Sequence, residues 1–358
     1  MRIIIIGRFY PEAFASFIEE GLAALGHEVI RLELGPKSAP EGTRIRFYLN
    51  RLSSKAHEEG KKLRGVLGLG AESVAIRRCV ERAGSADLTL CTHDYLTPVD
   101  AALVKQLTKA PLALWYPDPI WSFQRHMFLN GGYDLLFFKD PYIVDLLRRK
   151  IEAPAYYLPE CFSPASLGGG SYDERSESRF STDVCTAGNL YAYRVAFWNK
   201  LADFDAKIWG LPAPLWMDLG LVKPLVQNQW VGYETKALAF RFAKIVLNNL
   251  NPAEIWGTNV RTFEICGAGG FQLVDWRPGL SQLFNIGEEL VAFDTMADLR
   301  AKIRHYLQSD DERASIAERG QRRARRDHTY ELRLKLLIDT VMGRAQGYPM
   351  PLVQYKES

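Results

Sequence analysis

The sequence has little that would place the chain in a membrane or in an oxidising compartment. The four isoleucines at positions 3–6 are followed by Gly7 and Arg8, so this apolar run is far shorter than the roughly 20 residues of a membrane span. The five cysteines are scattered, odd in number and without a CxxC pair, which argues against a disulfide framework and a zinc site. We therefore expect a cytoplasmic protein with no transmembrane segment.

An excess of one charge and several catalytic motifs are also missing. The net charge is only +3, too weak to indicate nucleic-acid binding. The arginines between positions 322 and 326 lie in a predicted amphipathic helix, where a solvated face is the plainer interpretation. No GxSxG, HExxH or Walker sequence occurs. The DxD-like residues 203–205 precede a predicted strand and lie at the wrong sheet edge, so we expect no bound metal.

What is present is a globular composition with a repeated strand–helix pattern. A length of 358 residues exceeds one ordinary core and suits two domains. Residues 2–6 predict a buried strand, residues 11–25 an amphipathic helix, and HEVIRLE the next strand. Units of this length imply right-handed parallel crossovers. The sequence therefore predicts an α/β fold of two Rossmann-like, doubly wound domains.

The domain boundaries follow from composition. The first domain is predicted over 1–162, a Gly- and Ser-rich linker over 163–181, and the second domain over 182–327. Residues 328–358 are predicted to form a helix and tail that can cross back to the first domain. Residues 41–85 are charged, and their elements have no clear bounds. The other predicted strands lie at 86–92, 111–116, 133–138, 154–158, 182–188, 206–210, 244–248, 271–275 and 289–293.

The richest candidate site is the segment 257–264, GTNVRTFE. Thr258 is a predicted helix N-cap, which leaves the amides of the next turn, beginning at Asn259, free for phosphate oxygens. Arg261 and Glu264 are three residues apart and share one helix face. The arginine can clamp a diphosphate, and the carboxylate can accept both hydroxyls of a ribose. The plainer alternative is a simple cap with a local Arg261–Glu264 ion pair.

A second candidate follows the predicted strand that begins the second domain. Gly188 allows backbone to approach a ligand closely, and a helix begins just after Asn189. Arg194, one turn into that helix, can reach the same anion. The alternative is an ordinary turn with a surface arginine.

In the first domain, polar side chains follow three predicted strands. His93, Asp94 and Asp118 lie in such loops and are candidates for a general base. Several aromatic side chains accompany the candidate sites and either stack on sugar or base rings or belong to the core. These are Phe9, Tyr10, Trp115, Tyr116, Trp121 and Tyr191.

The stretch from GTNVRTFEICGAGGFQLVD through EELVAF to the closing HTY resembles the CgeB-like, spore-maturation type of glycosyltransferase, a family within the GT-B superfamily. The resemblance covers about 182–335 and extends weakly to LWYPDP and YDLLFFKDP in the first domain. It implies two Rossmann-like domains facing a central cleft. The first domain would bind the acceptor, and the second would bind a nucleotide sugar.

The resemblance also implies roles for individual residues. The diphosphate would be faced by two groups of residues, and Glu264 would bind the ribose. More distant retaining relatives carry two glutamates seven residues apart, but here Gly257 stands at the earlier position, so one sugar-contacting carboxylate is missing. The residues implied to face the diphosphate are Gly188, Asn189, Arg194, Thr258, Asn259 and Arg261.

We therefore expect a glycosyltransferase of the hexosyltransferase type that moves a sugar from a nucleoside-diphosphate sugar to an acceptor. The donor is a co-substrate, and neither another cofactor nor a metal is expected. Arg261 would stabilise the leaving diphosphate. Retention of configuration needs no protein nucleophile, whereas inversion would need Asp118 or His93 as a base.

Two other functions stay open. The missing carboxylate at Gly257 fits a GT-B-like binding or scaffold protein without turnover, and a nucleotide-sugar epimerase would need no acceptor. The acceptor can be a glycan, a protein, a small molecule or a modified nucleic acid. The sugar, the nucleotide base and the oligomeric state are also open.

Overall fold

The protein is described from a computed structural model. The residues that the structure describes are 1–34, 72–119, 127–168 and 173–351, with a few single residues between 56 and 70. The chain divides into two compact units. The first comprises Met1–Lys139, Ile143–Leu158 and Leu334–Pro349, and the second comprises Asp140–Tyr142, Pro159–Arg333 and Met350–Ser358. No helix in the described residues is long and apolar enough to cross a membrane.

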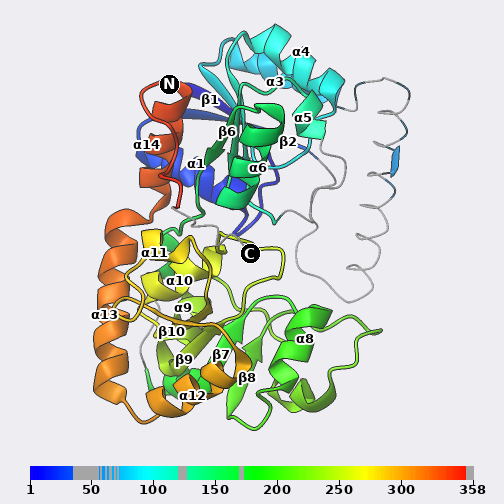
Figure 1. Ribbon diagram of the computed structural model, residues 1–358. Coiled ribbons are helices and arrows are strands. Elements are labelled where there is room, and N and C mark those ends of the chain that lie inside the picture. The colour runs from blue at the N-terminus through cyan, green and yellow to red at the C-terminus, as the bar shows by residue number, and fades with distance from the viewer. Residues whose placement is uncertain are drawn as a thin grey trace. The chain divides into compact units, whose positions relative to one another are not determined.

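The first unit is built on a parallel sheet of six strands in the order β2-β1-β3-β4-β5-β6 (Figure 1). The isoleucines of β1 are at most 1% exposed, as expected for a strand covered on both faces. Because β1 pairs with β2 on one side and β3 on the other, the strand order reverses at its carboxyl end, next to Gly7. The strands are β1 (Arg2–Gly7), β2 (Glu28–Glu33), β3 (Leu88–Cys91), β4 (Leu112–Tyr116), β5 (Leu135–Phe138) and β6 (Ala155–Tyr157). Its helices are α1 (Phe14–Ala24), α3 (Ser73–Ala83), α4 (Pro98–Thr108), α5 (Met127–Asn130) and most of α6 (Pro141–Ile151).

The second unit repeats this architecture with five parallel strands in the order β11-β10-β9-β7-β8 (Figure 1). Here the order reverses at β7, which pairs with both β8 and β9. Open sheets of this kind bind ligands at such a switch point. The strands are β7 (Thr182–Ala187), β8 (Ala206–Trp209), β9 (Ala243–Asn248), β10 (Gln272–Asp275) and β11 (Val291–Phe293). The helices are η2 (Ala165–Leu167), α7 (Glu174–Phe180), α8 (Ala192–Asn199), η3 (Gly220–Leu225), α9 (Tyr233–Phe242), α10 (Val260–Ala268), α11 (Leu280–Leu283), α12 (Met296–Tyr306) and α13 (Asp310–Asp327). Both sheets confirm the predicted fold class.

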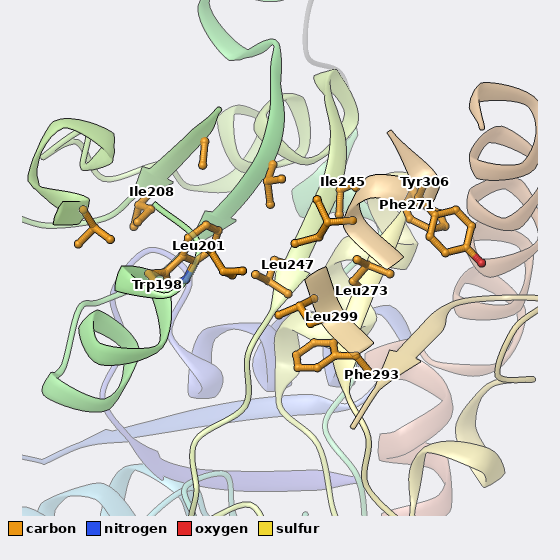
Figure 2. Packing of buried hydrophobic residues seen from close by; sticks show 14 of the residues in the cluster. Trp198, Leu201, Ile208, Ile245, Leu247, Phe271, Leu273, Phe293, Leu299 and Tyr306 are labelled. Atoms are coloured by element: carbon orange, nitrogen blue, oxygen red, sulfur yellow. The ribbon is translucent and has the colours of Figure 1, made fainter. Parts of the chain in front are cut away.

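One face of the second sheet packs against α8 and α12. Figure 2 shows Trp198 and Leu201 at the α8 end meeting Ile208 and Leu247 of the strands, with Leu299 of α12 beside them. Burying each of these side chains contributes about 1.5–3 kcal/mol. Since successive side chains of a strand alternate between faces, the other face is left to α9 and α10, which pack on β7, β9 and β10. The turns that follow β7 and β9 are therefore held by a core on either side.

The segment 163–181 is not the linker that its composition predicted. Where the structure describes it, η2 and α7 belong to the second unit and pack against α9. Leu167 and Phe180 are buried, and Asp173 caps α7 by accepting from the amide of Ser176 at 2.8 Å. The composition misleads because α7 exposes nearly all of its remaining, polar side chains. At the other end, α14 (Tyr330–Val341) begins in the second unit, and its residues from Leu334 on belong to the first.

A buried histidine fixes the junction between α13 and α14. His328 is 0% exposed, and its Nε2 donates to the carbonyl oxygen of Leu283 at 2.8 Å. Its Nδ1 lies 2.6 Å from Nη2 of Arg333, so the ring accepts there and is neutral. Burial and the positive charge of Arg333 lower the pKa of His328 to about 3.

This histidine predicts a pH dependence of stability. Because the unfolded chain binds a proton near the ordinary pKa of 6.5 and the folded protein only near 3, the stability that the neutral ring provides is complete above pH 6.5. It is lost as the pH falls towards 3, by about 1.4 kcal/mol per pH unit. Urea unfolding between pH 7 and 4.5 should show this slope, and His328→Gln should reduce it. His305→Gln, at an exposed histidine paired with Glu312, should leave it in place, and an equal slope in both variants would contradict the assignment.

Candidate functional site

The carboxyl end of β7 carries the turn on which the candidate site is built. Gly188 follows β7 directly and has a φ of +134°, a conformation that favours glycine. A Cβ atom at this position would lie 3.0 Å from Nη1 of Arg194 and 3.4 Å from Nη1 of Arg261. Two guanidinium groups, one from α8 and one from α10, therefore converge on a backbone position that has no side chain.

Arg194 lies in the first turn of α8 and is only 2% exposed. Its Nη1 donates to the carbonyl oxygen of Asn189 at 2.8 Å, and its guanidinium lies over the ring of Tyr191 at 4.9 Å. Its buried Nε has no hydrogen-bond partner among the described residues. Burial, together with the positive charge of Arg261, lowers the pKa of Arg194 to about 9. The folded protein thus holds this charge in an unfavourable environment.

Arg261 is the second residue of α10, and its Nη1 donates to the carbonyl oxygen of Ala187 at 3.0 Å. Burial lowers the pKa of Arg261, whereas Tyr191, Glu264 and Glu254 act in the opposite direction. Within the described residues, neither this guanidinium nor that of Arg194 forms an ion pair with a carboxylate. Arg194 is buried and Arg261 is half-buried, and an anion placed between two such neighbouring cations would relieve their mutual repulsion. The turn is therefore electrostatically prepared for an anion.

The start of α10 differs from the predicted cap by one residue. The N-cap is Asn259 rather than Thr258. Thr258 is 2% exposed and its hydroxyl is hydrogen-bonded to that of Thr262, while Asn259 exchanges side-chain hydrogen bonds of 3.1 and 3.2 Å with Asn248 at the end of β9. These side chains are engaged within the protein. What the turn offers a ligand is its backbone amides, since the first amides of a helix lack acceptors within it.

Glu264 lies one turn deeper in α10 and is bound by a lysine of α9. Nζ of Lys236 lies 2.7 Å from Oε1 of Glu264, and their side chains are 12% and 9% exposed. The local Arg261–Glu264 pair, the plainer alternative from sequence, is therefore not the ion pair that forms. The lysine fixes the direction of a carboxylate that is nearly buried.

The loop that precedes α10 is anchored by Asp140. Its Oδ2 accepts from the amide of Ile255 at 2.7 Å, and its Oδ1 accepts from the amides of Trp256 at 3.2 Å and Tyr142 at 2.9 Å. The rings of Tyr142 and Trp256 meet edge to face at 5.3 Å. The carboxylate thereby sets the path of the chain into the turn at Thr258.

In the first unit, two of the three candidate bases are paired. Nε2 of His93 lies 3.1 Å from Oδ2 of Asp118, and the His93 ring stacks at 4.6 Å on Tyr116. Burial raises the pKa of Asp118, but the hydrogen bond to His93 and the positive charges of His93 and Lys139 together lower it overall, so this carboxyl group is ionised. Asp94 is not part of the pair, because its Oδ2 accepts from the amide of Met127 at 3.2 Å.

Comparisons with known proteins agree with this architecture. Residues 194–339 match the family model described as glycosyl transferase-like. The chain superimposes on sucrose-phosphate synthase from Thermosynechococcus elongatus with a TM-score of 0.65 at 12% identity, covering 96% of this chain and 100% of the other. Anabaena HepE in complex with UDP superimposes with a TM-score of 0.64 at 12% identity, covering 96% of this chain and 100% of the other. For α,α-trehalose-phosphate synthase (UDP-forming) from Burkholderia vietnamiensis the TM-score is 0.62 at 13% identity, with the same coverage of both chains. The chain has the GT-B fold. A comparison with curated protein sequences gives no match.

Four of the predicted site residues lie together at the turn after β7. Gly188, Arg194 and Arg261 come together, and Asn189 joins them through its carbonyl oxygen. The predicted aromatic residues differ in their exposure and contacts. Trp115 and Tyr116 are core residues at 0% and 1% exposure, whereas Tyr10 is 48% exposed. Phe9 lies under the guanidinium of Arg31 and Tyr191 under that of Arg194, and Trp121 is outside the described residues.

The residues of the DxD-like pattern have structural partners. Asp203 forms an ion pair with Arg300, and Asp205 accepts from the hydroxyl of Thr182 at 3.1 Å. In the part of the chain that the structure describes, no group of three His, Cys, Asp or Glu side chains is arranged to hold a metal ion.

Sequence reasoning missed three residues that lie at or support this turn. Lys236 lies 28 positions before Glu264 and belongs to no motif. Gly210 follows β8, and a Cβ atom there would lie 2.5 Å from the carbonyl oxygen of Gly188. Its only sequence signal is a glycine directly after a strand. Asp140 lies in the first half of the chain, and nothing in its sequence context links it to the loop it anchors.

Proposed function

We propose that this protein is a glycosyltransferase of the hexosyltransferase type whose second unit binds a nucleoside-diphosphate sugar. The observation that carries the proposal is the convergence of Arg194 and Arg261 on Gly188 without a carboxylate partner in the described residues. A diphosphate would neutralise both cations and accept charge-assisted hydrogen bonds from them. The glycosyl transferase-like match over 194–339 includes both arginines.

The neighbouring residues suit the rest of such a donor. The amides at the start of α10 can add to the phosphate contacts, as helix N-termini do. Glu264, directed by Lys236, is proposed to accept the ribose hydroxyls with the oxygen that Lys236 does not bind. The solved HepE complexes contain UDP and UDP-glucose, and we propose a donor of this class here. The CgeB-like family is our proposal for the subgroup.

The proposed reaction breaks the bond between the anomeric carbon and the diphosphate oxygen and forms a bond from the anomeric carbon to the oxygen of an acceptor hydroxyl, whose proton passes to the leaving diphosphate oxygen. The negative charge that develops on the leaving diphosphate is stabilised by the two guanidinium groups and the amides, without a bound metal. We propose retention of configuration, with the acceptor bound by the first unit. His93 and Asp118 would then bind hydroxyl groups instead of removing a proton in the attacking step.

Binding of the donor is the first expected result. UDP-glucose and UDP should raise the melting temperature of the full-length protein, because a ligand of the folded state stabilises it by mass action. Glu264→Gln should weaken UDP-glucose binding about tenfold. Lys236→Met is the matched variant, because it breaks the same ion pair but keeps the carboxylate, and it should weaken binding less.

The products separate this proposal from its alternatives. Transfer or slow hydrolysis of the donor, with the anomeric configuration of the product read by NMR, supports a transferase. Binding without turnover would identify a scaffold protein. An epimerised sugar nucleotide formed without acceptor would identify an epimerase. If no sugar nucleotide or nucleoside diphosphate in a broad panel shifts the melting temperature, the proposal is wrong.

A further inference from the structure

A third arginine without an anionic partner among the described residues lies in the first unit, at the carboxyl end of β1. Arg8 follows Gly7, where the strand order of the first sheet reverses. Its side chain is half-buried, and its Nε is buried without a hydrogen-bond partner among the described residues. Its guanidinium lies over the ring of Tyr95, whose centroid is 5.7 Å from the guanidinium carbon. Such a guanidinium has lost part of its hydration and, within the described ranges, has gained no carboxylate in return.

Close packing around Gly7 fixes the path of the backbone at Arg8. A Cβ atom on Gly7 would lie 2.6 Å from Cβ of Ala15 and 2.7 Å from Oγ1 of Thr92, so only glycine fits between α1 and the loop after β3. The hydroxyl of Thr92 in turn donates to the carbonyl oxygen of Ile6 at 3.2 Å. The position of Arg8 at the strand end is therefore set by the core and not by a surface loop.

Tyr95 connects this arginine with the His93–Asp118 pair. The rings of His93 and Tyr95 lie 5.3 Å apart. Burial raises the pKa of Tyr95 to about 12, while the positive charge of Arg8 acts to lower it and the negative charge of Asp118 acts to raise it. Arg8, Tyr95, His93 and Asp118 are thus linked by successive contacts at the carboxyl edge of the first sheet.

We propose that the acceptor carries a small anionic group, a phosphate ester or a carboxylate, which Arg8 binds beside the His93–Asp118 pair. The inference rests on the proposed function, because it identifies the chemical class of the second substrate. A guanidinium is the side chain best matched to both groups, since its fork can donate two parallel hydrogen bonds to a pair of oxygens. The neighbouring His93 and Asp118 would then contact hydroxyl groups of the same molecule. Tyr95, stacked on the guanidinium, would keep its plane in place.

The test uses the full-length protein with its donor site filled by UDP and measures binding by calorimetry. The probes are glucose 6-phosphate, glucuronate and glucose, which share a ring and differ in their charged group. We expect at least one charged probe to bind about tenfold or more tightly than glucose. Arg8→Gln should remove this preference and leave UDP affinity unchanged. Arg77→Gln, at an exposed arginine of α3, should change neither.

Each contrary result has a distinct meaning. The inference is overturned if charged probes bind no more tightly than glucose, or if the preference survives in Arg8→Gln. It is also overturned if the preference disappears only in Arg261→Gln, because the anion would then occupy the donor site. If UDP fails to bind, the proposed function fails instead. In that case, the difference in affinity between charged probes and glucose, and its dependence on Arg8, can still be measured in the Arg261→Gln variant.

Discussion

Replacing Arg261 by glutamine is expected to lower kcat/KM for the nucleotide sugar by about 10²–10³-fold, the usual consequence of removing one donor that stabilises transition-state charge. Arg194→Gln should have an effect of similar size, because both guanidinium groups converge on Gly188. Combining the two substitutions should cost less than the product of the single effects, since residues that act on one group are not additive. Steady-state kinetics with UDP-glucose and product analysis provide the measurement.

Replacing Arg194 should not destabilise the unliganded protein. Removing Arg194 relieves a buried charge that lies next to a like charge, so Arg194→Met should raise the free energy of unfolding without ligand by about 1–2 kcal/mol. The stabilisation that saturating UDP provides should fall in the same variant. Arg325→Gln, at an exposed arginine of α13, is the control and should change neither activity nor stability. A variant that loses activity and unliganded stability together would mean that Arg194 is a structural residue instead.

The part of this site that could be predicted from sequence is the part set by local pattern. A strand followed by Gly188 and a helix predicts a ligand-binding turn. Arg261 at the start of another helix predicts a second ligand-binding segment. Their meeting follows from parallel topology, because the carboxyl ends of β7 and β9 share one edge of the sheet. No alignment between distant segments is required for that conclusion.

The remaining features depend on distances that a single sequence does not contain. The Lys236–Glu264 pair requires α9 and α10 to pack with one particular rotation, and a lysine on a helix is ordinarily solvated. The sequence predicts Thr258 as the N-cap, but the N-cap is Asn259. Both residue types can cap a helix, and the hydroxyl of Thr258 is hydrogen-bonded to that of Thr262 instead. The composition of segment 163–181 predicts a linker because the segment has few apolar residues that pack, among them Leu167 and Phe180.

Gly188→Ala should separate the geometry of the arginine pair from its charge. The added methyl group would meet Arg194 at 3.0 Å, so that guanidinium group must move by a few tenths of an ångström, and it would lie in contact with Arg261 at 3.4 Å. Small displacements of positioning groups can cost about 10²-fold in rate, and we expect kcat/KM to fall by roughly that factor. The φ of +134° adds a destabilisation of about 1–3 kcal/mol.

Gly287→Ala is the matched control for the backbone strain. Gly287 also has a positive φ, +90°, but a Cβ atom there would meet nothing within 4 Å. This variant should therefore lose stability by strain alone and keep its activity at temperatures where it is folded. If Gly188→Ala loses only as much activity as Gly287→Ala, the close approach of the arginines to the backbone has no catalytic role. A selective loss in Gly188→Ala, together with weaker UDP binding, would show that the phosphate site requires a bare backbone between its two cations.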